Sequence, residues 1–383
     1  MHILISALSR FTHPSGICRY AANLAKCLAE LEQISRITLV LGSWQKQYFT
    51  EDFQINSEKI QIYAVNIKNN SISRNIWFLF QLGELTKLIN PDLVHVSFPI
   101  PFLRFFFTQP VVATIHDFYP YEKPENFGFP NYIFNQIFTQ ICLKNADGIT
   151  CVSQVTLSRL KYYFPKIYQQ KLPTVIYNYV DFNKTESEPP TPKTIENTLF
   201  ILAVAQHRKN KNLDLLIQAY SLLINSQQIY ATTKLMIVGS EGLETQKLLQ
   251  LTHSFSLEKS IIFTSSVSDS ELCWLYKNCE LFVCPSATEG FCLPLAEALY
   301  FSCRIVCSDI PILREVGDSD CIYFSLEGET VKNLSTAIIN AYSQEKINSK
   351  RDNIRFIKSN IADQTLDFYH KFISGKFNHR LSI

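Results

Sequence analysis

Two series of short apolar segments, each alternating with longer helical patterns, constrain most strongly what this chain can fold into. The first series contains HILISAL, ITLVLG, LVHVSF, VVATIHD, GITCVS and TVIYN, with helical patterns such as YAANLAKCLAEL between them. Strands that alternate with helices in this way are typical of βαβ units, whose strands form a largely parallel sheet. The first series therefore predicts a doubly wound α/β domain over residues 1–182.

The second series begins after a stretch that has no apolar pattern. Residues 183–197, NKTESEPPTPKTIEN, are rich in Pro, Thr and Glu, which is typical of an interdomain linker. The alternation then resumes with TLFILAVA, KLMIVG, IIFTSS, LFVCPS, RIVCS and CIYF, which predicts a second doubly wound domain over residues 198–362. The amphipathic tail, about 363–383, is a candidate to pack back on the first domain.

Two open α/β domains predict where a ligand binds. Such sheets bind their ligands at the carboxyl ends of the strands, so we expect a cleft between the two domains to be the ligand site. The length of 383 residues agrees with two domains.

Composition excludes several classes of protein. The chain is 46% hydrophobic and 18% charged, and no segment approaches the roughly 18 apolar residues of a membrane-spanning helix. The start, MHILISALSRF, lacks the basic leader of a signal peptide, so we expect a cytoplasmic protein. The net charge of +2 argues against a nucleic-acid partner. The 11 Cys form no CxxC pair, which predicts reduced and mostly buried thiols instead of a zinc site or a disulfide framework.

Charge is distributed unevenly along the chain. Residues 1–180 carry 16 Lys and Arg against 11 Asp and Glu, whereas the remainder carries 20 against 23. Two interpretations stay open: the first domain faces an anionic partner, such as a membrane surface or a phosphorylated acceptor, or the surface charges are scattered at random.

Two acids flank a predicted helix start in PSATEGFCLPLAEALY, residues 285–300. With Pro294 at the first helical position, the unpaired amides of GFCLP form a ready anion site. Glu289 and Glu297 would be about 12 Å apart in a continuous helix, so they must have different roles. Acids, amides and an anion site together suggest a nucleotide sugar. The alternative is a helix whose first turn carries a dipole-favoured Glu, with a second Glu exposed nearby.

The segment PSATEGFCLPLAEALYFSCRIVCSDIPILREVGD resembles the E-x7-E region of the retaining glycosyltransferases of family 4. Other segments resemble the family in the same order: SGICRYAANLAKCL, VVATIHDFYPYEKPENF, CVSQVTLSRL, VIYNYVD and VAQHRKNKNLDLLIQAY. The resemblance covers nearly the whole chain. It implies an α/β GT-B fold, with two doubly wound Rossmann-like domains facing each other across a cleft.

The resemblance also implies roles for individual side chains. Glu289 matches the acid that contacts the donor sugar, and Glu297 the acid that holds the nucleotide ribose. Arg208 and Lys211 stand where the family places cations on the donor diphosphate. Fixed cations in a partly dry site stabilise the charge that a leaving diphosphate gains in the transition state. His116 matches a residue that touches the donor sugar, although an isolated His-Asp pair is more often a core or capping feature.

The donor-binding residues are completed by backbone positions. Gly16 permits close approach of a ligand to the chain. Four residues at the predicted helix start near Pro294 offer their backbone amides to the phosphate, namely Gly290, Phe291, Cys292 and Leu293. Asp117 is expected to support His116 by fixing its tautomer or closing the turn. The chain has Cys292 and Tyr179 at positions where Gly is common in the family, and its segment FSCRIV also differs from the usual family sequence. Cys292 is expected to narrow the space through which the phosphate approaches.

Two further motifs have alternative interpretations. The DSD at 318–320 is similar to the metal-binding Asp-x-Asp of GT-A enzymes, but its late position in a two-domain chain predicts an exposed turn, and we predict no metal and no cofactor other than the donor substrate. The run FPIPFLRFFF at 98–107 is expected to be core packing; the alternative is contact with a bilayer or a lipid acceptor.

The resemblance predicts a retaining, metal-independent hexosyltransferase. It would move a hexose from a GDP- or UDP-linked sugar to a hydroxyl of a glycan or lipid-linked oligosaccharide, in surface polysaccharide synthesis. We keep peripheral contact with the inner membrane face, through the first domain, as an open expectation. Two alternatives remain: a GT-B nucleotide-sugar epimerase, and a non-catalytic subunit of a polysaccharide assembly complex. A dehydrogenase is disfavoured because no strand is followed by the glycine fingerprint.

Overall fold

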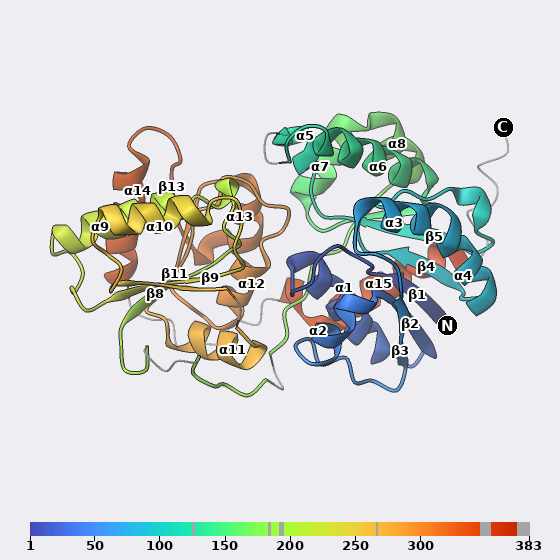
Figure 1. The fold of residues 1–383 in the computed structure, drawn as a ribbon, viewed down its shortest axis with the longest axis horizontal. Coiled ribbons are helices and arrows are strands. Elements are labelled where there is room, and N and C mark those ends of the chain that lie inside the picture. Colours follow the sequence, from blue (N-terminus) through green and yellow to red (C-terminus); the bar gives the residue numbers. More distant parts are fainter. Residues whose placement is uncertain (125–126, 183–184, 191–194, 266, 345–353, 374–383) are drawn as a thin grey trace. The chain divides into compact units, whose positions relative to one another are not determined.

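A computed structural model of the chain describes residues 1–124, 127–182, 185–190, 195–265, 267–344 and 354–373. The chain folds as two compact units (Figure 1). The first unit comprises Met1–Tyr179 and the C-terminal segment from Arg355, and the second comprises Val180–Ile354. Of the predicted linker, residues 183–184 and 191–194 lie outside the described part of the chain.

The first unit ends three residues before the predicted boundary at 182, and the chain returns to it at Arg355, eight residues before the predicted position of about 363. Ring contacts explain both differences. The ring of Phe182 lies 5.0 Å from that of Phe301, which ties residue 182 to the second unit. The ring of Phe356 packs edge-on against Tyr177 at 5.6 Å, so the return to the first unit occurs before residue 363.

The first unit is built on a parallel seven-stranded sheet with the order β3-β2-β1-β4-β5-β6-β7. Its strands are β1 His2–Ser6, β2 Arg36–Gly42, β3 Ile60–Val65, β4 Leu93–Val96, β5 Val111–Ile115, β6 Gly148–Cys151 and β7 Thr174–Val175. The central strands are buried on both faces: Ile3 and Ile5 of β1 belong to one hydrophobic cluster, and Leu4 to the other. This explains why the strands have continuous apolar sequences.

Helices cover both faces of this sheet (Figure 1). They are α1 Gly16–Ala29, η1 Ser43–Gln45, α2 Lys46–Thr50, α3 Ser71–Ile76, η2 Trp77–Gln81, α4 Leu82–Ile89, η3 Arg104–Phe106, α5 Tyr119–Glu122, α6 Asn131–Asn145, α7 Gln154–Tyr163, α8 Pro165–Lys171, η7 Ile354–Phe356 and α15 Lys358–Ile373. Side-chain caps begin two of them: Asn70 accepts from the amide of Ser73 before α3, and Ser153 accepts from the amide of Thr156 before α7.

The second unit repeats the plan with a parallel six-stranded sheet of order β10-β9-β8-β11-β12-β13. The strands are β8 Phe200–Val204, β9 Lys234–Val238, β10 Ile261–Thr264, β11 Leu281–Cys284, β12 Ile305–Ser308 and β13 Ile322–Phe324. The helices are η5 Lys209–Lys211, α9 Leu213–Asn225, α10 Thr245–Ser254, α11 Asp269–Asn278, α12 Leu293–Tyr300, α13 Pro311–Gly317, η6 Asp318–Asp320 and α14 Thr330–Tyr342. The two sheets confirm the prediction of two doubly wound, Rossmann-like α/β units.

The C-terminal helix α15 packs on the first unit, against α1. The hydroxyl of Tyr369 lies 2.5 Å from Nδ1 of His95 in β4. Gly148 of β6 lies so close to Phe372 that an added Cβ would be 2.4 Å from that ring. The tail therefore completes the core of the unit that the beginning of the chain forms.

Several elements were missed by the sequence analysis. Strand β3 pairs only with β2 at the edge of the sheet, and its side chains are mostly exposed or half-buried. The continuous helical segment α3–η2–α4 follows it, and its apolar residues point both inward and outward. Neither segment has the clean apolar pattern of a core element.

Other expectations are confirmed. Phe102 and Phe107 of the 98–107 run are buried, and Arg104 forms an ion pair with Asp147 at 2.9 Å, so most of this run is core packing. Phe105 is the exception, because 75% of its surface is exposed. The DSD at 318–320 forms a short 3-10 turn.

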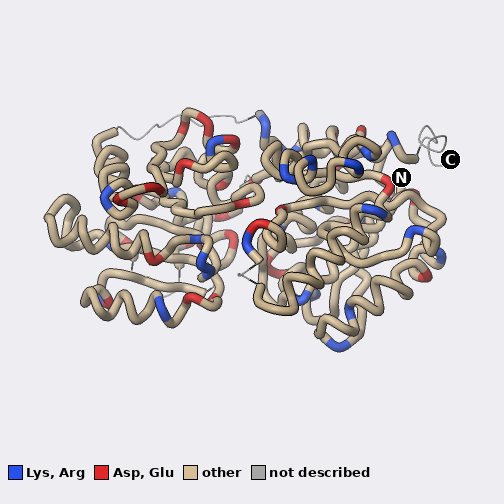
Figure 2. Tube along the Cα trace, turned by 90° about the horizontal axis from the view of Figure 1, so that it is seen from above, with Lys and Arg blue, Asp and Glu red and all other residues tan. Residues whose placement is uncertain are grey.

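The cysteines follow the expected distribution. All 11 Cys are free thiols, nine of them buried. Lys, Arg, Asp and Glu are interspersed along the elements of both units (Figure 2), which favours scattered surface charge over one basic face in the first unit. Within the described residues, no helix is both long enough and apolar enough to cross a membrane.

Candidate functional site

The predicted donor-binding residues of the second unit lie on two loops that backbone and amide hydrogen bonds join. One loop follows β8 and the other follows β11, at the carboxyl ends of adjacent strands. The amide of Ala287 donates to the carbonyl of Asn210 at 2.8 Å, and the Asn210 side chain donates to the carbonyl of Thr288 at 3.2 Å. The Asn212 side chain donates to the carbonyl of Pro285 at 2.9 Å. These bonds fix the two loops against each other.

Lys211 and Glu289 form an ion pair across these loops. Lys211 Nζ lies 2.5 Å from Glu289 Oε1, and the two side chains are only 19% and 8% exposed. The hydroxyl of Ser286 donates a second hydrogen bond, of 2.7 Å, to the same oxygen. The hydroxyl of Ser308 donates a hydrogen bond to the backbone carbonyl of Ser286, which fixes the backbone of Ser286. The Glu289 carboxylate is therefore fixed by two donors.

The charge state of Lys211 follows from this environment. Burial alone would lower the pKa of its ammonium, but the Glu289 carboxylate together with the Cys292 and Cys284 sulfur atoms outweighs burial, and the pKa is raised. Lys211 is consequently a cation at neutral pH. A fixed cation of this kind, at the carboxyl end of a sheet, suits a phosphate group.

Helix α12 begins one residue earlier than the sequence predicted, at Leu293, so Pro294 occupies the second helical position. Cys292 precedes the helix in the left-handed conformation, with φ of 70°. This conformation is unfavourable for a residue with a Cβ, which explains why glycine suits the position. The Cys292 thiol is buried and lies 3.5 Å from the sulfur of Cys284.

Glu297 has a different partner from Glu289. It lies in α12, is 4% exposed, and accepts a 2.9 Å hydrogen bond from the hydroxyl of Tyr276 in α11. The same hydroxyl lies 3.3 Å from the carbonyl of Pro294. Burial and the neighbouring carboxylate raise the pKa of Tyr276 well above its ordinary value, so the phenol stays protonated. The two acids thus have separate environments.

The other predicted site residues of this unit, Arg208, Gly290 and Phe291, lie on the same two loops. Gly290 and Phe291 precede α12, and Phe291 is buried. Arg208 is half-buried at the start of η5, where its carbonyl accepts from the amide of Lys211 at 3.0 Å. The structure therefore brings the side chains of Lys211, Glu289 and Cys292 together.

His116 follows β5 in the first unit, at the carboxyl end of that strand. Its Nε2 lies 2.8 Å from the carbonyl of Ser97, and burial lowers its pKa to about 4. The ring is therefore neutral at pH 7, with Nε2–H donating to Ser97 and a lone pair on Nδ1. Asp117 accepts from the amide of Tyr119 at 3.0 Å, which closes the turn.

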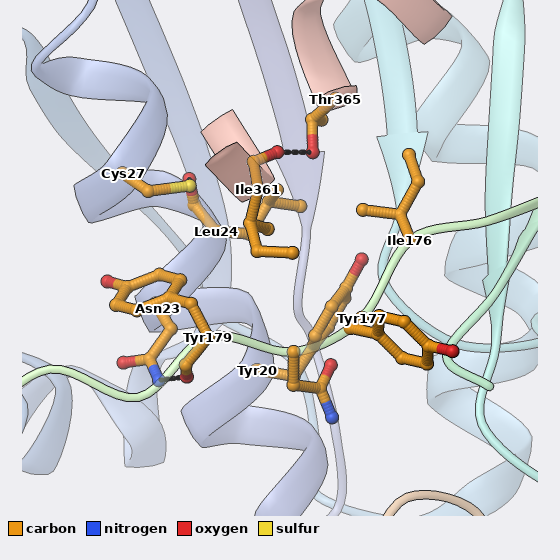
Figure 3. Close-up of a pocket in the computed structure, with 10 residues that line it drawn as sticks. Tyr20, Asn23, Leu24, Cys27, Ile176, Tyr177, Tyr179, Ile361 and Thr365 are labelled. Carbon is orange, nitrogen blue, oxygen red and sulfur yellow. Dashed lines mark hydrogen bonds between the residues drawn. The ribbon is translucent and has the colours of Figure 1, made fainter. Parts of the chain in front are cut away.

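A pocket in the first unit lies between α1, α15 and the segment after β7 (Figure 3). Tyr20 lines this pocket and packs edge-on against the His116 ring, with 4.7 Å between centroids. The Tyr20 hydroxyl lies 2.7 Å from Thr114 Oγ1, which also bonds Nε2 of His95. Gly16 opens α1 and has open space where a Cβ would stand, so a ligand can approach the backbone there.

Two family models match consecutive parts of the chain. The model described as "Glycosyltransferase Family 4" matches residues 14–184, and the model described as "Glycosyl transferases group 1" matches residues 184–356. The chain belongs to glycosyltransferase family 4. The predicted membership of family 4 is thereby confirmed.

Curated relatives of this family 4 chain include two named mannosyltransferases. It is 27% identical to "Serotype-specific mannosyltransferase WbdA" of Escherichia coli over 69% of its own length, and spans 34% of that protein. It is 24% identical to "O-antigen chain mannosyltransferase RfbU" of Salmonella typhimurium strain LT2, with 85% of this chain and 87% of the relative covered. The chain thus spans about a third of WbdA and most of RfbU.

A solved structure confirms the GT-B fold. The crystal structure of Anabaena Alr3699/HepE in complex with UDP and glucose matches with a TM-score of 0.70 and 18% identity, covering 95% of this chain and 98% of that one. At this identity the match shows the fold alone.

Three residues that position the site were missed by the sequence analysis of this family 4 member. Ser286 holds Glu289, Asn210 joins the two loops, and Tyr276 bonds Glu297. Ser286 and Asn210 lie within the motifs that contain Glu289 and Lys211. Their polar side chains, close in sequence to the acid and the cation, could have indicated a positioning role. Tyr276 lies 21 residues before Glu297, and no local pattern links the two.

Proposed function

We propose that this chain is a retaining hexosyltransferase that uses a nucleoside diphosphate sugar as its donor. The observation that carries the proposal is the ion pair between Lys211 and Glu289, because it places a cation for the diphosphate beside an acid for the sugar. The joined loops hold both groups rigidly, as an electrostatic site requires.

The donor diphosphate is proposed to bind between the loop after β8 and the start of α12. Lys211 and Arg208 supply positive charge, and the first amides of α12, with those of Gly290 and Phe291, supply hydrogen-bond donors. When the bond to the sugar breaks, the leaving diphosphate gains negative charge. Cations that are already in place stabilise this charge without reorganisation.

The two acids are proposed to bind opposite ends of the donor. Glu289 accepts hydrogen bonds from hydroxyls of the sugar, and Glu297 accepts them from the ribose. Glu289 is already bonded to Lys211 and Ser286, which supports a positioning role over that of a nucleophile. Retention of configuration then follows if the acceptor attacks on the face from which the phosphate departs, with the phosphate taking the acceptor proton.

His116 is proposed to contact the donor sugar as a neutral group. Its Nε2–H is engaged by the carbonyl of Ser97, so Nδ1 is the atom that can accept a hydrogen bond from a sugar hydroxyl. Its lowered pKa keeps it in this form at neutral pH.

The acceptor is proposed to be a hydroxyl of a glycan or a lipid-linked oligosaccharide in surface polysaccharide synthesis. The support comes from the relatives, which are named as O-antigen chain and serotype-specific mannosyltransferases. These names make mannose the first donor sugar to test. The solved GT-B structure with UDP and glucose makes a UDP-linked hexose the second.

Peripheral contact with a membrane is proposed through the first unit. Ile72, Ile76 and Phe80 are spaced four residues apart along α3 and η2, and all are exposed; with Phe105 they form what we call the apolar ridge. Phe80 and Phe105 both contact the ring of Phe106, at 6.1 and 4.2 Å between centroids, so the aromatic part of the ridge is continuous. Exposed apolar residues of this kind support contact with a bilayer.

A product assay tests the function. The full chain is incubated with GDP- and UDP-linked hexoses and candidate acceptors, and the nucleotide and sugar products are identified. Release of nucleoside diphosphate with sugar on an acceptor supports transfer, an isomerised donor supports an epimerase, and no turnover with any donor supports a non-catalytic subunit. Glu289→Ala is expected to abolish turnover, and full activity of that variant would contradict the proposal. Thermal stabilisation identifies the donor first, since a ligand at 100 times its Kd adds about 2.7 kcal/mol.

A further inference from the structure

Two thiols and a carboxylate converge beside the donor-binding loops. Cys284 ends β11 and Cys292 precedes α12, and their sulfur atoms are 3.5 Å apart. One ligand atom from each of Cys284, Cys292 and Glu289 lies within 4.8 Å of the other two. Among the described residues, this is the group of His, Cys, Asp and Glu side chains that meets the geometry of a metal site.

We propose that Cys284, Cys292 and Glu289 form an inhibitory binding site for a thiophilic divalent cation, with Zn²⁺ as the chemical type. Thiolate sulfur and carboxylate oxygen are ligands of tetrahedral Zn²⁺, and soft sulfur selects it over Mg²⁺ or Ca²⁺. Three protein ligands leave a fourth position for water. Binding displaces two thiol protons to solvent, and no oxidant or reductant is required.

The surroundings of the three ligands suit a bound cation. The Ser286 hydroxyl donates to Glu289 and also lies 3.6 Å from the Cys284 sulfur, so it orients two of the ligands. Two thiolates and a carboxylate around a dication leave one negative charge, which the ammonium of Lys211 balances at 2.5 Å from Glu289. Cys284 and Cys292 are each 7% exposed, so the site is largely shielded from solvent.

The bound cation would inhibit sugar transfer because it would coordinate the Glu289 carboxylate, which the donor sugar needs for binding. This consequence rests on the proposed function, whereas the binding itself does not. The site is distinct from a catalytic metal: it engages Glu289 in place of the sugar, and transfer is expected to proceed without the ion.

A second thiol pair in the same unit offers a matched control. The sulfur atoms of Cys279 and Cys303 are 3.8 Å apart. Within the described residues, this pair does not form part of a three-ligand group. Substitution of Cys303 therefore removes a thiol from a close pair without touching the proposed site.

The experiment titrates the reduced full-length chain with Cd²⁺ and follows the ultraviolet charge-transfer absorption of thiolate–cadmium bonds. The variants are Cys284→Ala, Cys292→Gly, Glu289→Gln and the control Cys303→Ser. Glycine is chosen at 292 because it adopts the left-handed conformation of that residue without strain. Circular dichroism checks that each variant is folded.

One saturable Cd²⁺ site is expected in the wild type and in Cys303→Ser, with affinity lowered about tenfold or more in the three ligand variants. An unchanged titration in both Cys284→Ala and Cys292→Gly overturns the proposal, and so does an equal loss in Cys303→Ser. In a transfer assay, Zn²⁺ is expected to inhibit the wild type and Cys303→Ser alike. If the wild type binds Cd²⁺ at the site but Zn²⁺ does not inhibit transfer, the inhibitory role is overturned while the binding site stands. If no transfer is found, the proposed function fails while the metal titration still decides the site.

Discussion

Lys211 Nζ lies 2.5 Å from Glu289 Oε1, and this ion pair links the loop after β8 to the loop after β11. Both side chains are largely shielded from water, so each charge depends on the other for compensation. The pair is therefore expected to contribute to both the stability of the second unit and donor binding. The two contributions can be separated by experiment.

Lys211→Met is expected to lower the free energy of unfolding by about 3 kcal/mol, because it leaves the Glu289 carboxylate buried without its cation. Chemical denaturation measures the loss. The control is Lys247→Met, which breaks a more exposed pair with Asp214 and is expected to cost less than about 1 kcal/mol. Equal losses in the two variants would contradict the importance assigned to the buried pair.

Tyr276→Phe removes the hydroxyl that donates to Glu297. We expect a loss of about 1–3 kcal/mol in the free energy of unfolding, because a buried carboxylate oxygen loses its donor. We also expect weaker binding of the nucleoside diphosphate, measured by calorimetry below the unfolding temperature. Tyr230→Phe, at a residue that is 75% exposed, is the control. A destabilised variant with unchanged nucleotide affinity would refute a role for Glu297 in ribose binding.

The first unit is expected to lose stability as the pH falls below about 6.5. Burial, helped by the neighbouring His116, lowers the pKa of His95 to about 3 in the folded state, from the ordinary 6.5. Between these values the unfolded chain binds a proton that the folded chain does not, so acid favours unfolding. The loss for His95 is about 2 kcal/mol at pH 5, and His116 adds a loss of the same sign.

Urea denaturation at pH 7 and pH 5 measures this effect. In His95→Asn the difference between the two pH values should shrink by about the same 2 kcal/mol. A variant whose pH dependence equals that of the wild type would show that His95 is not the group responsible.

The double variant Phe80→Ser, Phe105→Ser is expected to weaken binding to anionic lipid vesicles by about tenfold or more, because each exposed aromatic ring loses apolar contact with the bilayer. Sedimentation with phosphatidylglycerol vesicles measures the binding. Leu243→Ser, at a residue of the second unit that is 89% exposed, is the control. Absence of vesicle binding by the wild type would remove the proposal for this surface.

The local patterns of the sequence predicted most of the fold for a physical reason. Strands of a parallel sheet are buried on both faces, so β1 and β11 appear as continuous apolar segments that can be recognised without any partner. Strand β3 escaped notice because it lies at an edge, where alternating exposure weakens the apolar signal. The start of α12 was placed one residue late because proline is tolerated throughout the first helical turn.

The sequence by itself determined the two α/β units, the family motifs and the chemical types of the site residues, since these depend on local periodicity and on residue identity. Only the tertiary structure decided which groups meet: Lys211 with Glu289 across 78 residues, Glu297 with Tyr276, and Cys284 with Cys292. Such pairings depend on how loops from different strands end at one edge of a sheet, and local periodicity does not encode that geometry.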